Sequence, residues 1–164
     1  MGKRLFYSHP VVYNNIKFAS TTERDVYKKL RSLGFNPIYE PATITVWEGR
    51  KKTTVPFYNS PTSNLKCQKT IDCVQYTPDF IVEMFGKTVF IEVKGRENEG
   101  FPYRRKLFRD WLESHGNPKN TFYFEIRNLT QCQQMLEILE FGKILTKVTK
   151  RKKKEKPNGK KKIK

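Results

Sequence analysis

The chain has 164 residues, of which 37% are hydrophobic, enough for one domain with a hydrophobic core. Its formal net charge of +17 excludes a neutral surface and leads us to expect an anionic partner. The charge is uneven: 11 of the 33 Lys and Arg residues lie from residue 147 onward beside one Glu, while the preceding part carries 22 basic and 15 acidic residues.

The three cysteines have neither disulfide-framework nor zinc-site spacing, which favours reduced thiols in the cytoplasm. The sequence has no signal-peptide pattern and no apolar run of membrane-spanning length, so we expect no membrane partner.

Residues 1–19 are predicted to form an arm or a short hairpin, with residues 11–13 pairing with 16–18 around Asn14-Asn15. A helix is predicted from Ser20 to about Leu33, and its apolar stripe includes Leu33. Glu23 lies on the same stripe. A capping box, in which Glu23 reaches back to the Ser20 amide, explains this position structurally, and an inward functional carboxylate is the alternative.

A strand is predicted over residues 43–47. The polar stretch 48–75 is longer than a connection requires, which indicates either a hairpin extension or a substrate-contacting loop. Two apolar strands follow, over 80–85 and 88–93, joined by a turn at Gly86-Lys87. Alternation places Val89, Ile91 and Val93 on one face of the second strand and Phe90, Glu92 and Lys94 on the other.

A second helix is predicted from Pro102 to about Ser114, with Tyr103 among its buried residues. A strand over 121–126 and a last helix, capped by Thr130 and ending near Glu140, complete the order helix, three strands, helix, strand, helix. The fold class is therefore α/β, a mixed sheet flanked by helices. Residues 143–164 are a Lys-rich tail that is expected to be flexible and disordered in isolation.

Three ionisable residues are expected to meet at one edge of the predicted sheet. Asp79 follows a proline at the start of one strand, and Glu92 and Lys94 stand at alternate positions at the end of the next. Carboxylate oxygens suit Mg²⁺ or Mn²⁺, and the Val93 carbonyl is expected to add a ligand. Glu23 is expected to complete the ligand shell or hold a second ion. The alternative for the Glu-x-Lys pair is an exposed ion pair of little energetic value.

The segments T-P-D-F and F-I-E-V-K resemble the active-site signature of the PD-(D/E)xK nuclease superfamily. The flanking segments Y-N-N-I-K-F-A-S-T-T-E and F-P-Y-R-R-K-L-F resemble small phage-encoded nucleases similar to Holliday-junction resolvases of the endonuclease I type. The resemblance covers residues 10–128 in pieces. It implies a restriction-endonuclease-like αβββαβ core within residues 20–142 and a catalytic set of Glu23, Asp79, Glu92 and Lys94.

The resemblance also suggests Gln75 and Arg96 as supporting or phosphate-contacting residues. The chain departs from many relatives in having Glu40-Pro41 where they have Gln-Pro before the first strand, which puts a supporting role there in doubt.

The helix after the site is crowded with cations. These are either a solvated face or contacts to the phosphates of the strand being cut, and we expect contact for at least one of them. With Arg96, the expected nucleic-acid-binding residues are Arg104, Arg105, Lys106 and Arg109. The tail is interpreted as a nonspecific tether to nucleic acid.

The leading hypothesis is a Mg²⁺-dependent DNA endonuclease acting on duplex or branched DNA, with a homodimeric phage resolvase as its most specific form. The alternatives are an end-cleaving subunit of a transposition or recombination system and a catalytically inactive nucleic-acid-binding protein that retains the fold. The expected location is the cytoplasm, which for a phage-encoded chain is that of the host cell.

Overall fold

The computed structural model describes residues 9–60, 64–95 and 99–141. The Lys-rich tail, Arg96 and the first eight residues lie outside this range, so the predictions made for them stay predictions. The described part contains three helices and several small sheets, and the predicted α/β class is confirmed. Among its helices, none combines the length and apolarity needed to cross a membrane.

The centre of the molecule is a four-stranded mixed sheet in the order β10-β9-β8-β3. Its strands are β3 (Ile38–Tyr39), β8 (Phe80–Met84), β9 (Lys87–Val93) and β10 (Thr121–Ile126). β8 runs antiparallel to both β3 and β9, whereas β10 runs parallel to β9. The parallel pair requires a crossover, which the helix α2 (Phe101–His115) provides.

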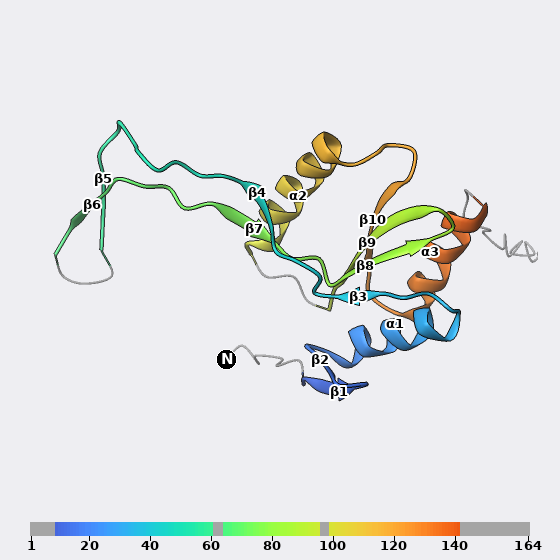
Figure 1. Ribbon diagram of the computed structural model, residues 1–164. Helices are drawn as coiled ribbons and strands as arrows, with labels where there is room; N and C mark the ends of the chain where they lie inside the picture. Colours follow the sequence, from blue (N-terminus) through green and yellow to red (C-terminus); the bar gives the residue numbers. More distant parts are fainter. Residues whose placement is uncertain (1–8, 61–63, 96–98, 142–164) are drawn as a thin grey trace, which may run out of the picture.

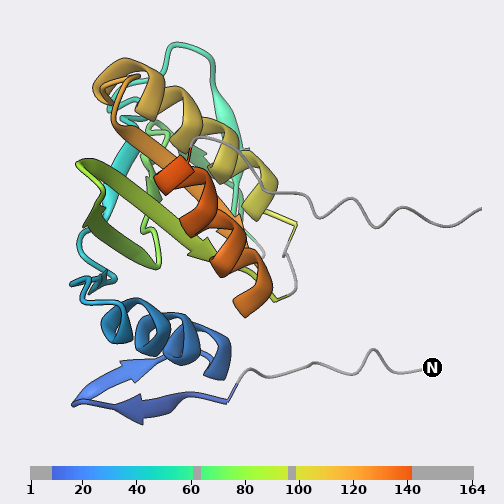
Figure 2. The same ribbon diagram turned by 90° about the vertical axis from the view of Figure 1, so that its right-hand side faces the viewer.

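Helices cover both faces of this sheet, as Figures 1 and 2 show. The helices α1 (Thr21–Ser32) and α3 (Leu129–Phe141) pack with Val89, Ile91 and Val93 in one apolar cluster, and α2 packs with Phe90 in another. The predicted alternation along β9 is therefore confirmed. Because both faces are covered, residues 89–93 are all buried.

The predicted N-terminal hairpin is present, with β1 (Val11–Tyr13) antiparallel to β2 (Ile16–Phe18). Asn14 and Asn15 have φ angles of 50° and 60°, the left-handed conformation that a two-residue hairpin turn requires. The hairpin contacts α1 through Tyr13. The centroid of the Tyr13 ring lies 6.4 Å from that of the Tyr27 ring.

Residues 44–60 and 64–76 form a long two-stranded arm, so the hairpin extension is the correct interpretation of the polar stretch. At its base β4 (Ile44–Trp47) pairs with β7 (Val74–Tyr76), and farther out β5 (Phe57–Asn59) pairs with β6 (Lys66–Gln68). The strand predicted over residues 43–47 is present as β4, but it pairs with β7 outside the four-stranded sheet. The short strand β3 pairs with β8 in that sheet instead, and Glu40, with φ of 43°, turns the chain away before β4 begins.

Three details of the helices differ from expectation. Tyr103 is 70% exposed, and Phe101, at the first position of α2, is buried instead. α3 begins before Thr130, because the Gln131 amide donates to the Asn128 side chain at 2.9 Å and Asn128 serves as the cap. Leu33 is 47% exposed because it follows the last residue of α1 as its C-cap.

Candidate active site

A pocket of about 440 Å³ lies where β8 begins and β9 ends. Phe80 pairs with Ile91 across these antiparallel strands, so the next residues outward, Asp79 and Glu92, stand opposite each other. Both line the pocket together with Lys94, so the structure brings together the three residues that were predicted to meet at the ends of two strands. The remaining lining residues are Thr43, Gln75, Tyr76, Thr77, Phe101 and Arg104.

Asp79 is held at the mouth of the hairpin by the backbone of β9. The Val93 amide donates to Asp79 Oδ2 at 2.6 Å. Burial, and next the negative charge of Glu92, raise the pKa of Asp79 from 3.8 to about 7; Glu23 adds to the rise, while the Val93 amide and Lys94 oppose it. A carboxyl group with a strongly shifted pKa, beside a second carboxylate and the cations Lys94 and Arg104, is typical of a functional site.

Glu92 is the most deeply buried charged group of the pocket, with 3% of its surface exposed. One carboxylate oxygen accepts a hydrogen bond from the Tyr76 hydroxyl at 2.5 Å, and the other is paired with the Lys94 ammonium group. Burial, reinforced by the charge of Glu92, raises the pKa of Tyr76 far above its ordinary value, so Tyr76 stays protonated and remains a donor. Its ring is fixed by stacking on Phe108 of α2, with centroids 4.3 Å apart.

Lys94 directly follows the last residue of β9. Besides its ion pair with Glu92, two contacts fix its position. Its amide donates to the Ile126 carbonyl at 2.8 Å, which extends the pairing of β9 with β10. Its ammonium nitrogen lies 4.0 Å from the centre of the Phe101 ring, a favourable cation–π distance. The ammonium group is thus directed into the pocket between Glu92 and the first turn of α2.

Glu23 does not line the pocket, although it is buried and close enough for its charge to raise the pKa of Asp79. Its carboxylate accepts hydrogen bonds from the Ala19 amide at 3.0 Å, the Ser20 hydroxyl at 2.7 Å and the Tyr39 hydroxyl at 2.7 Å. The Glu23 amide donates in turn to Ser20 Oγ. A cap is therefore present, but the carboxylate reaches the amide of Ala19 rather than that of Ser20. A metal-binding role for Glu23 stays a prediction.

The donor set of the pocket fits a hard divalent cation. Asp79 and Glu92 offer carboxylate oxygens, the ligands that Mg²⁺ prefers, and such ions complete their coordination with water and substrate phosphate oxygens. Within the described ranges, no three His, Cys, Asp or Glu side chains form a ready-made metal cluster. The role of the Val93 carbonyl as a ligand stays a prediction, since the contact seen here is made by the Val93 amide.

The four cations predicted on α2 have different surroundings. Arg104 lines the pocket. Arg105 is paired with Glu125 at 2.9 Å and stands over the Phe101 ring, while Lys106 is exposed.

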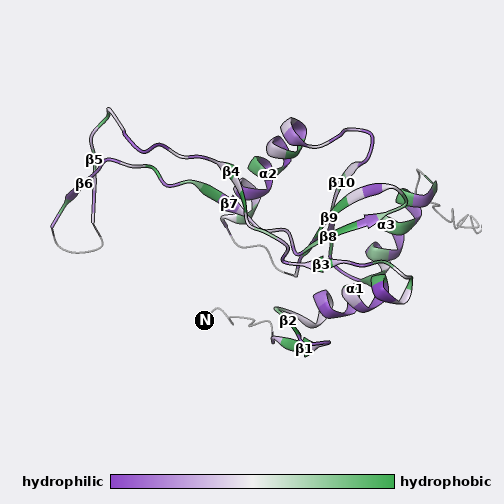
Figure 3. Ribbon diagram, in the orientation of Figure 1, coloured by the Kyte–Doolittle hydropathy of each residue, from purple (hydrophilic) through white to green (hydrophobic). Residues whose placement is uncertain are grey.

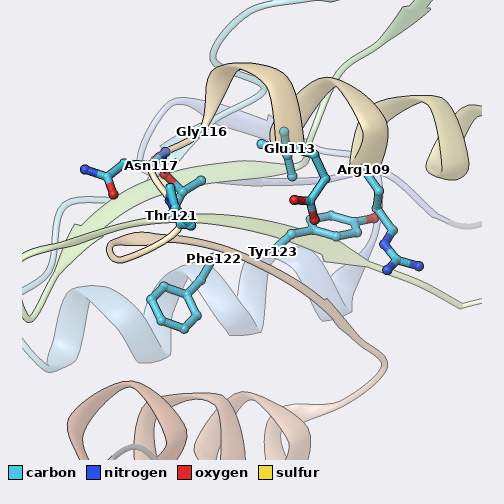
Figure 4. Close-up of a pocket in the computed structure, with 9 residues that line it drawn as sticks. Arg109, Glu113, Gly116, Asn117, Thr121, Phe122 and Tyr123 are labelled. Atoms are coloured by element: carbon cyan, nitrogen blue, oxygen red, sulfur yellow. Dashed lines mark hydrogen bonds between the residues drawn. The ribbon is translucent and has the colours of Figure 1, made fainter.

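Arg109 lines a second cavity, of about 330 Å³, at the junction of α2 and β10. Figure 4 shows its side chain and that of Glu113 on the helix, with Asn117 and Thr121 on the segment that follows. None of the expected catalytic residues lines this cavity. Of the four cations, Arg104 is therefore the one that lines the pocket with Asp79, Glu92 and Lys94.

Three tyrosines of the site were not assigned a role from the sequence. Tyr39 binds Glu23, Tyr76 binds Glu92, and the Tyr123 hydroxyl lies 2.9 Å from that of Tyr76. The parallel register, with Tyr123 beside Phe90, puts Tyr123 on the face of Glu92. The sequence does show aromatic residues at alternate positions of the strands. To predict their partners from this pattern, one would also need to know how distant strands are aligned with each other.

Comparison with curated proteins finds no match to the chain. The family described as "Protein of unknown function (DUF1064)" matches residues 4–135, which include the first helix, the arm, the pocket and most of α3. This match covers most of the 164 residues. The chain belongs to the DUF1064 family.

Proposed function

We propose that the chain is a metal-dependent DNA endonuclease that hydrolyses phosphodiester bonds. The observation that carries the proposal is the convergence of Asp79, Glu92 and Lys94 in one pocket. Two carboxylates and a lysine, delivered by adjacent antiparallel strands, are the groups that a cation-assisted attack of water on a phosphodiester requires.

The arrangement of the elements gives further support. The order α1, β3, β8, β9, α2 and β10, with a parallel pair at the end, is that of an αβββαβ core. We propose that this is the restriction-endonuclease-like core that the sequence resemblance implies. The site then lies at the edge where β8 begins and β9 ends.

Each pocket residue has a role in this proposal. Asp79 and Glu92 would hold Mg²⁺ or Mn²⁺, which when bound makes water more acidic and offsets charge on the phosphate. Lys94 orients the attacking water or stabilises the developing negative charge, and its contacts with Glu92 and Phe101 limit its movement. Arg104 contacts a substrate phosphate from the opposite wall. Tyr76 holds Glu92 in its orientation.

The experiment is DNA cleavage in Mg²⁺ by Glu92→Gln, with Glu83→Gln as the matched control. Glu83 is exposed at the far end of the same hairpin, so its substitution removes the same charge away from the pocket. We expect Glu92→Gln to lower the cleavage rate about 100-fold or more, the size of effect seen when a charge-stabilising group is lost, and Glu83→Gln to leave it unchanged. Equal rates for the wild type and Glu92→Gln would contradict the assignment.

The same assay addresses the preferred substrate. A resolvase of branched DNA should cut a four-way junction faster than a linear duplex built from the same sequences. Equal cutting of both would leave the endonuclease proposal standing and remove the junction preference. Binding of DNA without any metal-dependent cleavage by the wild type would favour the inactive binding protein instead.

A further inference from the structure

The arm formed by residues 44–60 and 64–76 reaches well away from the central sheet (Figure 1). Figure 1 shows β5 and β6 at its outer part, far from β8, β9 and β10. Every residue of β5 and β6 is exposed. A two-stranded ribbon of this kind is only marginally stable by itself in water, so an arm that buries so little gains stability when a partner covers it.

The outer arm combines positive charge with exposed aromatic rings. We define the arm surface as the exposed residues of 47–60 and 64–73. Phe57 and Tyr58 are each 59% exposed and Trp47 is 38% exposed. Figure 3 shows hydrophilic stretches along both strands of the arm. The charged residues of the arm surface are Arg50, Lys51, Lys52, Lys66 and Lys69 against Glu48 and Asp72.

These two chemistries meet in a third cavity, of about 390 Å³, on the arm itself. Arg50 and Lys52 line it together with the apolar side chains of Val55 and Phe57. Cations beside an aromatic surface suit nucleic acid, because the cations pair with phosphates while the ring contacts sugars or bases.

We propose that the arm is a DNA-binding ribbon that lies in the major groove of a duplex beside the cleavage site. The major groove of B-form DNA admits a two-stranded β-ribbon, whereas that of A-form RNA is too deep and narrow for side chains to read. A second copy of the chain is a poorer occupant of the arm surface. Both copies carry a net charge of +17, so two such arms repel each other, while a polyanion is attracted.

The arm is continuous with the candidate active site. β7 returns from the arm directly into the pocket, which is lined by Gln75, Tyr76 and Thr77. A duplex held along the arm is therefore brought to Asp79 and Glu92. This link to cleavage rests on the proposed function, whereas the binding of DNA by the arm does not.

The test is fluorescence polarisation with a labelled DNA duplex of about three helical turns, in EDTA so that no cleavage occurs. The full chain is compared with a triple variant, Lys52→Gln, Lys66→Gln and Lys69→Gln. A second triple variant at Lys17, Lys28 and Lys119 removes the same charge from exposed positions on the body.

We expect the arm variant to bind at least about tenfold more weakly and to lower the slope of log K against log salt by about three, as the loss of three phosphate contacts requires. The body variant should stay close to the wild type. The arm variant should keep the wild-type urea midpoint, because its three side chains are exposed. The body variant loses the contact between the Lys28 ammonium group and the Tyr13 ring, so we expect a small decrease in its midpoint without a change in DNA affinity.

Equal affinities for the two variants would overturn the proposal. So would an arm variant that changes the molar mass in light scattering but keeps its DNA affinity, since that result assigns the arm to a second copy. Arm-dependent binding without Mg²⁺-dependent cleavage by the wild type would remove the nuclease proposal and leave this one standing. Mg²⁺-dependent cleavage without arm-dependent binding would remove the proposal for the arm and leave the nuclease proposal standing.

Discussion

At the scale of single residues, the pocket is defined by the partners of two carboxylates, the buried Glu92 and the half-buried Asp79. Glu92 has a tyrosine hydroxyl on one oxygen and an ammonium group on the other, while Asp79 has one backbone amide. The sequence predicted that Asp79 and Glu92 would meet, because a hairpin brings neighbouring strands together, but it also placed Glu23 with them, and Glu23 does not line the pocket. It did not predict that Tyr76 donates to Glu92, that Tyr123 contacts Tyr76 or that Tyr39 donates to Glu23, because each of these contacts joins different elements whose relative position depends on the tertiary fold.

Tyr76→Phe tests how much the tyrosine contributes to the site. The substitution keeps the ring on Phe108 and removes the donor to a buried carboxylate, so we expect a loss of about 1–3 kcal/mol in the free energy of unfolding. Tyr103→Phe, at a position 70% exposed, should change this free energy little. Urea unfolding in EDTA measures both. A loss no larger for Tyr76→Phe than for Tyr103→Phe would contradict the assigned contact.

The raised pKa of Asp79 predicts how stability depends on pH in the absence of metal. The folded state, with a pKa of about 7 for this group, holds the proton more tightly than the unfolded state, whose pKa is near 3.8. The stability from this group is therefore present in full below the unfolded pKa and is lost as pH rises through 7, with a slope of up to about 1.4 kcal/mol per pH unit.

Urea unfolding in EDTA between about pH 5 and pH 8 measures this dependence in the wild type and in Asp79→Asn. The variant cannot ionise at this position, so we expect a flatter profile. A wild-type profile that rises with pH more steeply than that of the variant would show that the pKa is shifted in the opposite direction.

At the scale of elements, α2 connects the sheet to the site. Its buried Phe108 contacts Tyr76, Phe90 and Tyr123, so one side chain supports β7, β9 and β10. Local hydrophobic patterns and turn residues predicted most elements. These include the first hairpin, the helices α1 and α2 and the strands β8, β9 and β10. The strand β3 could not be predicted because two residues give no alternation, and the pairing of β4 with β7 depends on a long-range register.

Phe108→Ala should be among the most destabilising single substitutions in the chain. Phe108 is fully buried, and its loss leaves a cavity under Tyr76, so we expect a decrease of about 3–5 kcal/mol in the free energy of unfolding. Tyr103→Ala on the same helix is the control, since the position is exposed. Similar unfolding midpoints for the two variants would contradict the placement of α2 on the sheet.

At the scale of the whole molecule, charge and shape are combined around one edge of the sheet. The pocket, the first turn of α2 and the base of the arm meet there through Arg104, Gln75 and Thr77. The sequence indicated an anionic partner from its net charge but left the long polar stretch as either a hairpin or a loop. The arm could not be resolved further because weak, exposed strands have no buried face to set their pattern.

The central claim is that the pocket cuts DNA with the help of Lys94. The most direct measurement is the rate of Mg²⁺-dependent cleavage of DNA by the wild type, by Lys94→Ala and by Lys119→Ala, which removes the same charge at an exposed position near the opposite end of the parallel pair. We predict metal-dependent cleavage by the wild type and by Lys119→Ala. For Lys94→Ala we predict a cleavage rate that is reduced about 100-fold or more. Equal cleavage by all three proteins would contradict the account.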